Sequence, residues 1–402
     1  MLHKASLSRL AVLLAAAAAS SVAFTGSTQA ASNTRAGTHR HHRKVTKVTK
    51  ARHHVAKRPV ARIANVFGPS LFGIATGSTL QNEVGTPALA SDLRDDRAAG
   101  ARWIRIDINW AQIQEQGPSS YFWTDIDTAV RTAERDGMNV LGTIAYTPSW
   151  ARPANSVATY GPKPSQYAKF AGIAARHYSA MGVQAFEIWN EPNVQAFWTP
   201  RPRPAKYTAV LKAAYVAIKS VDPRATVMTG GLAPAANDGT NYTPVSFLKD
   251  IYAHGGKGYF DAVANHPYCW PAYPGAKYAW SAWYQMYGTR PSLRSLMVSH
   301  GDGNKKIWAT EFGAPTDGPP GSYVSDATQA KMVSKAFRLF SHYKWAGPLF
   351  MYSGRDLGSS TDTRENFFGF LKHNFARKPS FTAYHREMVS VRAVATAASR
   401  VR

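Results

Sequence analysis

The chain has 402 residues, of which 45% are hydrophobic and 12% aromatic, and this composition excludes a chain that is disordered throughout. Its single cysteine, Cys269, excludes an intrachain disulfide framework and a cysteine-based zinc cluster. The chain is strongly basic, with 48 Lys and Arg against 24 Asp and Glu, a net charge of +24.

Residues 1–31 have the layout of a secretory signal peptide. Lys4 and Arg9 precede an Ala- and Leu-rich run over residues 10–24, and small residues follow around Ala30. The alternative is a signal anchor that stays in the membrane. It is the weaker interpretation, because an apolar run of roughly 15 residues is too short to span a bilayer. We therefore expect a secreted, extracellular protein.

Residues 32–64 are predicted to form a disordered basic linker. Between Ser32 and Arg62 lie ten Lys and Arg and five His residues, with no acidic residue and no hydrophobic period. This segment could hold the protein on an anionic cell envelope or wall, or it could be a solvated spacer. No nucleic-acid-binding motif accompanies the charge, so specific nucleic-acid binding is not expected. Without these ten basic residues and the two of the signal segment, the rest of the chain has a net charge of +12.

Residues 65–402 are predicted to form one α/β domain, in which strand-like runs alternate with helix-like segments. The periodicity predicts helices over Thr124–Arg135, Ser165–Gly182, Tyr207–Val221, Asp326–Tyr343 and Pro379–Val391. Eight strands in this alternation favour a (β/α)8 TIM barrel over an open doubly wound sheet, which usually has fewer strands. The predicted strands are Leu71–Thr76, Trp103–Trp110, Asn139–Tyr146, Ala185–Trp189, Thr226–Gly231, Phe260–His266, Lys306–Thr310 and Pro348–Tyr352.

Two of these strands deliver a carboxylate at their C-terminal ends, where a barrel places its reactive groups. Glu191 follows the fourth strand in the sequence Trp-Asn-Glu-Pro-Asn, and Glu311 ends the seventh in Thr-Glu-Phe-Gly. Two carboxylates that face each other across a cleft are the equipment for cleaving a glycosidic bond.

The sequence Trp-Asn-Glu-Pro-Asn over residues 189–193 resembles the acid/base motif of glycoside hydrolase clan A, the retaining (β/α)8 enzymes. The segments Tyr-Thr-Pro-Ser-Trp-Ala at 146–151 and His-Pro-Tyr at 266–268 agree with this. Within the clan, the chain is most similar to family 39 and to family 5 cellulase-like proteins. The resemblance implies that Glu191 is the general acid/base and Glu311 the nucleophile, and that Asn190 binds the sugar hydroxyl beside the anomeric carbon.

Alternation along the second strand puts Arg105, Asp107 and Asn109 on the barrel face and the isoleucines on the helix face. Arg105 then resembles the arginine with which the clan keeps its nucleophile ionised; the alternative is a structural ion pair, for example with Glu187. His266 and Tyr268 share one face, and Tyr268 could donate a hydrogen bond to Glu311. The alternative for His266 is a core histidine.

Aromatic residues gather after the strands and could stack on sugar rings. Those selected as substrate-binding candidates are Tyr146, Trp150, Trp270 and Tyr352. Arg355 stands near where many clan members have a tryptophan, which leaves room for an anionic or heavily hydroxylated sugar.

These features predict a secreted, monomeric, retaining glycoside hydrolase that cleaves β-linked polysaccharide or oligosaccharide and needs no metal or cofactor. The alternative is a non-catalytic carbohydrate-binding or cell-wall-associated barrel, against which the intact pair Glu191 and Glu311 argues. The sugar, its linkage and endo or exo action depend on the loops after the strands and stay open.

Overall fold

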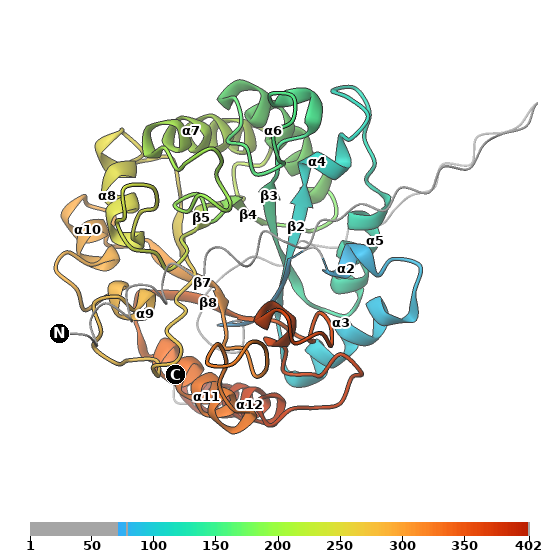
Figure 1. Cartoon of the computed structure of the whole chain (residues 1–402), viewed down its shortest axis with the longest axis vertical. Helices are drawn as coiled ribbons and strands as arrows, with labels where there is room; N and C mark the ends of the chain where they lie inside the picture. The colour runs from blue at the N-terminus through green and yellow to red at the C-terminus, as the bar shows by residue number, and fades with distance from the viewer. Residues whose placement is uncertain (1–70, 78, 401–402) are drawn as a thin grey trace, which may run out of the picture.

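The computed structural model describes residues 71–77 and 79–400, so the predicted signal segment, basic linker and the boundary between linker and domain lie outside the described residues. Eight parallel strands close into a barrel in the order of the sequence, and helices surround it (Figure 1). This confirms the predicted (β/α)8 fold. The strands are β1 (Phe72–Gly77), β2 (Trp103–Asn109), β3 (Asn139–Ala145), β4 (Ala185–Asn190), β5 (Thr226–Gly231), β6 (Ala262–Asn265), β7 (Lys306–Phe312) and β8 (Ala346–Tyr352).

Every predicted strand bound agrees with the observed one to within two residues. The largest differences are at β6, which is shorter than predicted, at β8, which begins earlier, at Ala346, and at β7. Strand β7 continues past Thr310 because Phe312 still pairs with Met351 of β8. Glu311 therefore lies within a strand rather than after it.

The outer layer contains the five predicted helices and three that the periodicity did not predict. Its members are α3 (Pro87–Ala99), α5 (Thr124–Arg135), α6 (Pro164–Ser179), α7 (Pro204–Val221), α8 (Pro244–Ala253), α10 (Leu293–Ser299), α11 (Asp326–His342) and α12 (Pro379–Arg400). Shorter turns are α2 (Thr79–Asn82), α4 (Trp110–Ile113), α9 (Ala282–Gln285) and the 3₁₀ segments η3 (Ser149–Ala151) and η4 (Arg364–Phe367). No helix in the described ranges has the length and apolar character needed to cross a bilayer.

Helix α3 was not predicted from hydrophobic periodicity, because the residues that define it are those at its two ends. The Thr86 hydroxyl accepts a hydrogen bond from the amide of Ala88, Pro87 occupies the first turn, and Gly100 ends the helix at φ +114°. Caps of this kind satisfy terminal backbone groups and stabilise a helix even when its apolar stripe is weak.

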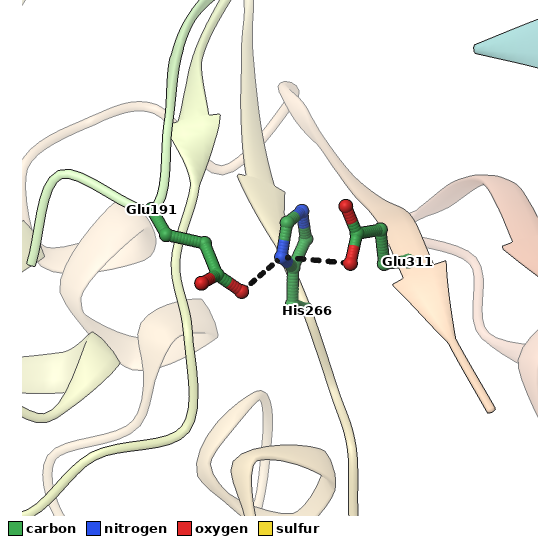
Figure 2. Close-up of side chains that lie close together, drawn as sticks. All are labelled: Glu191, His266 and Glu311. Carbon is green, nitrogen blue, oxygen red and sulfur yellow. Dashed lines mark hydrogen bonds and ion pairs between the residues drawn. The ribbon is translucent and has the colours of Figure 1, made fainter. Parts of the chain in front are cut away.

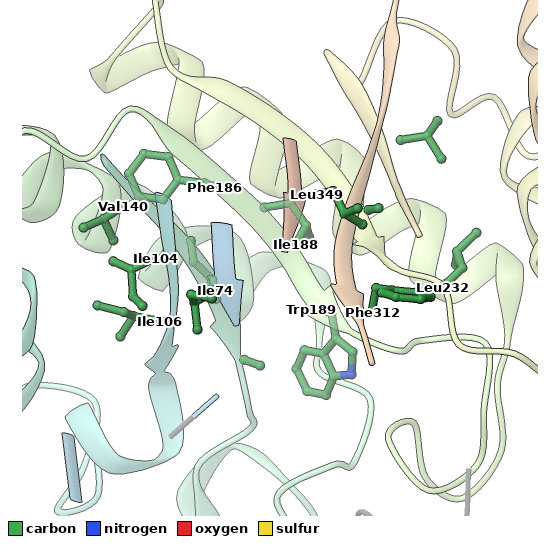
Figure 3. Close-up of a cluster of buried hydrophobic side chains, with 14 of the residues drawn as sticks. Ile74, Ile104, Ile106, Val140, Phe186, Ile188, Trp189, Leu232, Phe312 and Leu349 are labelled. Atoms are coloured by element: carbon green, nitrogen blue, oxygen red, sulfur yellow. The ribbon is translucent and has the colours of Figure 1, made fainter. Parts of the chain in front are cut away.

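The apolar core lies mainly between the strands and the helices. Ile104, Ile106 and Ile108 of β2 are buried on the helix side, as alternation predicted, and Figure 3 shows part of this layer. A second apolar cluster fills the inside of the barrel and includes Trp103, Trp308 and Phe350, whose rings pack against one another.

Glycines in the strands make space for these large rings. A Cβ atom on Gly347 would lie 2.4 Å from Trp308, and one on Gly73 would lie 2.4 Å from Phe350. The inside of the barrel is therefore a packed apolar floor. Polar residues are placed above it, at the C-terminal ends of the strands.

Candidate active site

Glu191 and Glu311 face each other at the C-terminal end of the barrel. Glu191 directly follows β4 and has φ +48°, a left-handed conformation that is uncommon for a non-glycine residue. Its amide donates to the carbonyl of Gly231 at the end of β5. A carboxylate oxygen of each glutamate lies within 4.8 Å of one of the other. Such a separation suits a retaining glycosidase, since inverting enzymes hold the two carboxyls about 6.5–9.5 Å apart.

Arg105 connects the strands beneath this pair. Its Nη1 donates to Oε1 of Glu311 at 2.8 Å, its Nε to Oε2 of Glu187 at 2.5 Å, and its Nη2 to Oδ1 of Asn190 at 2.8 Å. Both sequence interpretations of Arg105 therefore hold at once, as a partner of Glu311 and as a structural ion pair. Burial alone would lower the pKa of Arg105, but Glu187 and Glu311 outweigh it and raise the pKa.

Two threonines complete the buried pair of Arg105 and Glu187. Thr143 of β3 donates to Oε2 of Glu187 and Thr310 of β7 donates to Oε1, each at 2.8 Å. A buried charge is tolerated when it is paired and its remaining lone pairs are satisfied. Sequence reasoning gave these threonines no role, although inward alternation on their strands could have indicated one.

The second oxygen of Glu311 accepts a hydrogen bond from the hydroxyl of Tyr268 at 2.8 Å. Burial raises the pKa of Glu311 to about 7, while Arg105 and Tyr268 act in the opposite direction. Nδ1 of His266 lies 3.5 Å from the same oxygen. Glu311 is thus held in place by groups from β2 and from the segment after β6.

His266 lies between the two carboxylates (Figure 2). Its Nδ1 is 2.8 Å from Oε1 of Glu191. Burial, reinforced by Arg105, lowers the pKa of His266 well below its usual range, so the ring is neutral. A Cβ atom on Gly231 would lie 2.0 Å from Nε2 of His266, so only glycine leaves space for the ring. His266 is fully buried, as a core histidine would be, and it contacts both candidate catalytic carboxylates.

The two glutamates differ in proton affinity. Burial, followed by the charge of Glu311, raises the pKa of Glu191 well above its usual range. The pKa of Glu311 is raised less, because Arg105 and Tyr268 stabilise its charged form. As the pH rises, Glu311 therefore loses its proton before Glu191, and the pair passes through a state with one acid and one carboxylate.

The four aromatic candidates are placed differently. Tyr146 packs edge-on against Trp189, and Tyr352 ends β8 beside Phe368; both are partly exposed. Trp150 is also partly exposed, and its indole N–H donates to the carbonyl of Gln114 at 2.7 Å. These three side chains are therefore partly open to solvent.

Trp270 does not match the expectation of an exposed stacking platform. Its side chain is only 2% exposed, and the guanidinium of Arg364 lies 5.2 Å above its ring. The ring is therefore buried against Arg364 of η4.

Arg355, which stands near where many clan members have a tryptophan, is bound by acidic side chains. It forms a bidentate ion pair with Asp92 of α3, with N···O distances of 2.8 and 3.1 Å, and a further contact with Glu83. These ion pairs join the segment after β8 to the region of α3.

Two acidic residues near the site were given no function by sequence reasoning. Asp107 lies on β2 two residues beyond Arg105, and Glu365 lies in η4 after β8. Alternation along β2 places Asp107 on the barrel face, which was a usable signal. Glu365 lies in an irregular segment where no periodicity operates.

Glu191, His266 and Glu311 each offer a ligand atom, and within the described residues these atoms lie within 4.8 Å of one another. His266 contacts both carboxylates, and Glu311 also accepts hydrogen bonds from Arg105 and Tyr268. The expectation of a metal-independent enzyme stays a prediction.

A protein-family model described as cellulase, glycosyl hydrolase family 5, matches residues 61–346. Among solved structures, the fold is similar to a family 39 glycoside hydrolase from the gut symbiont Bacteroides cellulosilyticus WH2, with 23% identity and a TM-score of 0.64. That alignment covers 82% of this chain but 65% of the other, so this chain spans just under two thirds of that enzyme. A search of curated protein sequences returns no match.

Two further structures show the same fold. A GH5_18 protein from Streptomyces cattleya in complex with GlcNAc has 15% identity and a TM-score of 0.60, with 81% of each chain covered. A glucosidase from Croceicoccus marinus has 16% identity and a TM-score of 0.58, covering 82% of this chain and 69% of that one.

Proposed function

Because the chain belongs to the cellulase family, glycosyl hydrolase family 5, we propose that it cleaves a β-linked polysaccharide or oligosaccharide by double displacement. The observation that carries this proposal is the pair of carboxyls within 4.8 Å of each other, held in unequal surroundings. Glu311 has two hydrogen-bond donors that favour its ionised form, whereas burial and its acidic neighbour keep a proton on Glu191.

In the first step, an ionised oxygen of Glu311 attacks the anomeric carbon as the glycosidic C–O bond breaks. Glu191 donates its proton to the departing oxygen, and a glycosyl ester of Glu311 forms. Esterification removes the negative charge of Glu311, which removes the main electrostatic reason for Glu191 to hold a proton.

In the second step, Glu191 as a carboxylate takes a proton from water while the water oxygen attacks the anomeric carbon. The ester bond breaks, Glu311 regains its charge, and the sugar is released with retained configuration. Arg105 binds Oδ1 of Asn190, which leaves the Asn190 amide nitrogen as the end that can donate to a sugar hydroxyl.

The proposal is tested with Glu191→Gln and Glu311→Gln on a panel of β-glycans and aryl β-glycosides, with exposed Glu115→Gln as the matched control. We expect Glu311→Gln to abolish turnover. Glu191→Gln should retain activity mainly on substrates with acidic leaving groups, because these need no proton. Proton NMR of the first product should show the β-anomer. First release of the α-anomer, or glycan binding by all variants with no hydrolysis by the wild type, would reject the mechanism.

We also propose that the protein is exported and that its basic linker, residues 32–64, associates with an anionic envelope. The support is the sequence pattern of residues 1–64 alone. Mass spectrometry of the mature protein from culture medium and from washed cells, with and without residues 32–64, tests both parts. A chain that keeps residues 1–31, or a deletion that leaves envelope binding unchanged, would contradict them.

A further inference from the structure

Two buried side chains that the proposed mechanism does not use bind three consecutive backbone carbonyls in the segment after β8. Lys378, which precedes α12, is 3% exposed, and its Nζ donates to the carbonyl of Phe367 at 3.2 Å. Gln329 of α11 is fully buried, and its Nε2 donates to the carbonyls of Phe368 and Gly369, each at 3.2 Å. This stretch of backbone is therefore fixed by side chains and not only by its own hydrogen bonds.

The ammonium group of Lys378 has three N–H donors and finds three acceptors. Besides the carbonyl of Phe367, its Nζ donates to Oδ1 of Asp356 at 2.7 Å and to the hydroxyl of Thr316 at 2.8 Å. Asp356 follows β8 and is 4% exposed, and Thr316 lies in the loop after β7. The same oxygen of Asp356 accepts a hydrogen bond from the amide of Gly369 at 2.9 Å. Lys378 thus joins the loops after β7 and β8 through a buried ion pair, which is costly to break.

Gln329 makes a second connection between the same two loops. Its Nε2 also lies 2.9 Å from the carbonyl oxygen of Ala314, three residues after Glu311 in the chain. Its Oε1 accepts a hydrogen bond from the hydroxyl of Ser380 in α12 at 2.6 Å. An apolar side chain in place of this amide would leave buried backbone carbonyls without these donors, so the loops would lose a fixed point.

The backbone that Lys378 and Gln329 bind carries the ring of Phe368, which packs against Tyr268. The centroids of these two rings are 5.9 Å apart, and the ring planes meet at 80°, an edge-to-face pair. The hydroxyl of Tyr268 donates to Oε2 of Glu311 at 2.8 Å. A short series of contacts therefore connects two side chains on the helix side of the barrel to the proposed nucleophile.

We propose that Lys378 and Gln329 are positioning residues for the proposed nucleophile. By fixing the backbone of Phe368, they hold its ring against Tyr268. That ring in turn keeps the Tyr268 hydroxyl on Glu311. This inference rests on the proposed glycosidase function, in which Glu311 is the nucleophile, and it gives that function two further residues that touch neither substrate nor reacting atoms.

The protonation of Glu311 reports on this arrangement, because a hydrogen bond to a carboxylate favours its charged form. Loss of the Tyr268 hydrogen bond raises the pKa of Glu311, whereas a looser site that admits water lowers it, since burial is what raises this pKa most. The direction of the change therefore separates positioning from general loosening. The titratable and charged groups that face Glu311 are Arg105 and Asp107 of β2, Glu187 and Glu191 at the end of β4, and His266 and Tyr268 after β6.

The test is an NMR titration of the full chain with glutamate labelled at its side-chain carboxyl carbon, in which Glu311→Gln identifies the signal of Glu311. The variants are Lys378→Met and Gln329→Met, each alone and each combined with Tyr268→Phe. Exposed Lys372→Met, in the same segment as Lys378, is the matched control. The pH profile of kcat/KM on an aryl β-glycoside is measured in parallel, and thermal unfolding checks that each variant is folded.

We expect each single variant to move the titration midpoint of Glu311 up by about half to one pH unit, and by no more than Tyr268→Phe does. Neither should move it further in the Tyr268→Phe background, because the effect runs through that phenol. Lys372→Met should leave the midpoint unchanged. A midpoint that falls or stays the same in a folded Lys378→Met or Gln329→Met variant overturns the proposal, as does an added shift in the double variants.

The NMR titration does not depend on turnover, so the two proposals fail in different ways. Raised midpoints in a chain that hydrolyses no glycoside would reject the glycosidase mechanism and support the positioning of Tyr268. Hydrolysis by the wild type, with the midpoint of Glu311 unchanged in both single variants, would reject only the positioning. Absence of hydrolysis together with unchanged midpoints would reject both.

Discussion

The hydroxyl of Tyr268 lies 2.8 Å from Oε2 of Glu311 and donates to it a hydrogen bond that lowers the pKa of this carboxyl. Burial acts in the opposite direction and is the larger effect, so the pKa of Glu311 is raised to about 7. Two opposing effects therefore set the pKa of Glu311, the proposed nucleophile. Burial raises it, and the phenol of Tyr268 and the guanidinium of Arg105 lower it.

The first prediction concerns the pH profile. Turnover needs Glu311 ionised and Glu191 protonated, so kcat/KM should fall as the pH drops below about 7 and again at high pH, where Glu191 ionises. In Tyr268→Phe the lost hydrogen bond should move the acidic limb to higher pH and lower kcat/KM at neutral pH. Exposed Tyr278→Phe is the control. An acidic limb that moves to lower pH in Tyr268→Phe would contradict this account.

The second prediction concerns the cost of burying Glu191. The pKa of Glu191 is raised in the folded chain, whereas in the unfolded chain it is about 4.5. Above pH 4.5 the folded protein therefore keeps a proton on Glu191 that the unfolded protein releases. The stability of the wild type should then decrease as the pH rises from about 4.5 to neutral. Glu191→Gln carries no such cost and should be more stable by on the order of 1–3 kcal/mol at pH 7, with little difference at pH 4.

Urea unfolding of both proteins at the two pH values measures this difference, with Glu115→Gln as the control for an exposed glutamate. An equal change at pH 4 and pH 7 would show that the substitution acts through packing and not through the proton.

The third prediction concerns the space beside His266. A Cβ atom in Gly231→Ala would lie 2.0 Å from Nε2 of His266 and 2.8 Å from Oγ1 of Thr310, so the imidazole must move. Because His266 binds Glu191, we expect kcat/KM to fall by at least about tenfold, with a stability loss of about 1–3 kcal/mol.

Gly172→Ala on α6 is the matched control for that substitution. Its Cβ would meet only Ala217 at an ordinary 3.4 Å, and alanine favours a helix by up to about 1 kcal/mol. Activity should be unchanged there. Full activity in Gly231→Ala would show that the site tolerates a displaced His266.

The fourth prediction concerns Asn193, which ties the segment after Glu191 to neighbouring loops. Its Nδ2 donates to the carbonyls of Ala233 and Tyr242 at 2.8 Å, and its Oδ1 accepts from the amide of Ala233 at 2.9 Å. Asn193→Ala leaves these buried groups without partners and should cost about 3 kcal/mol, with reduced kcat because Glu191 is less well placed. Exposed Asn374→Ala, which loses one backbone hydrogen bond, should cost well under half of that in the same denaturation experiment.

Much of this barrel could be predicted because its strands carry local signals. The isoleucines of β2 alternate with Arg105 and Asp107, which predicts the side of the strand that faces the barrel. The seventh strand carries Glu311 at its C-terminal end, which predicts the end of the barrel where the site lies. Helix α3 was missed because its signals are the Thr86 cap and Gly100 rather than an apolar stripe.

The side-chain partners could not be predicted in the same way. Arg105 and Glu311 are separated by 206 positions in the chain, and their contact depends on the closure and register of the whole barrel. Trp270 and Arg355 follow strands, in the part of the sequence where substrate contacts are expected. In the structure the ring of Trp270 is buried, and Arg355 forms an ion pair with Asp92.

The sequence by itself determined the order of strands, the two carboxylates at their C-terminal ends and the segregation of half of the net charge into residues 1–62, because each of these follows from neighbouring residues and their periodicity. Only the tertiary structure decided which donors hold Glu311, why His266 needs Gly231, and that Arg355 pairs with Asp92. These properties depend on distances between segments that are remote in the chain, and closing the barrel is what brings those segments together.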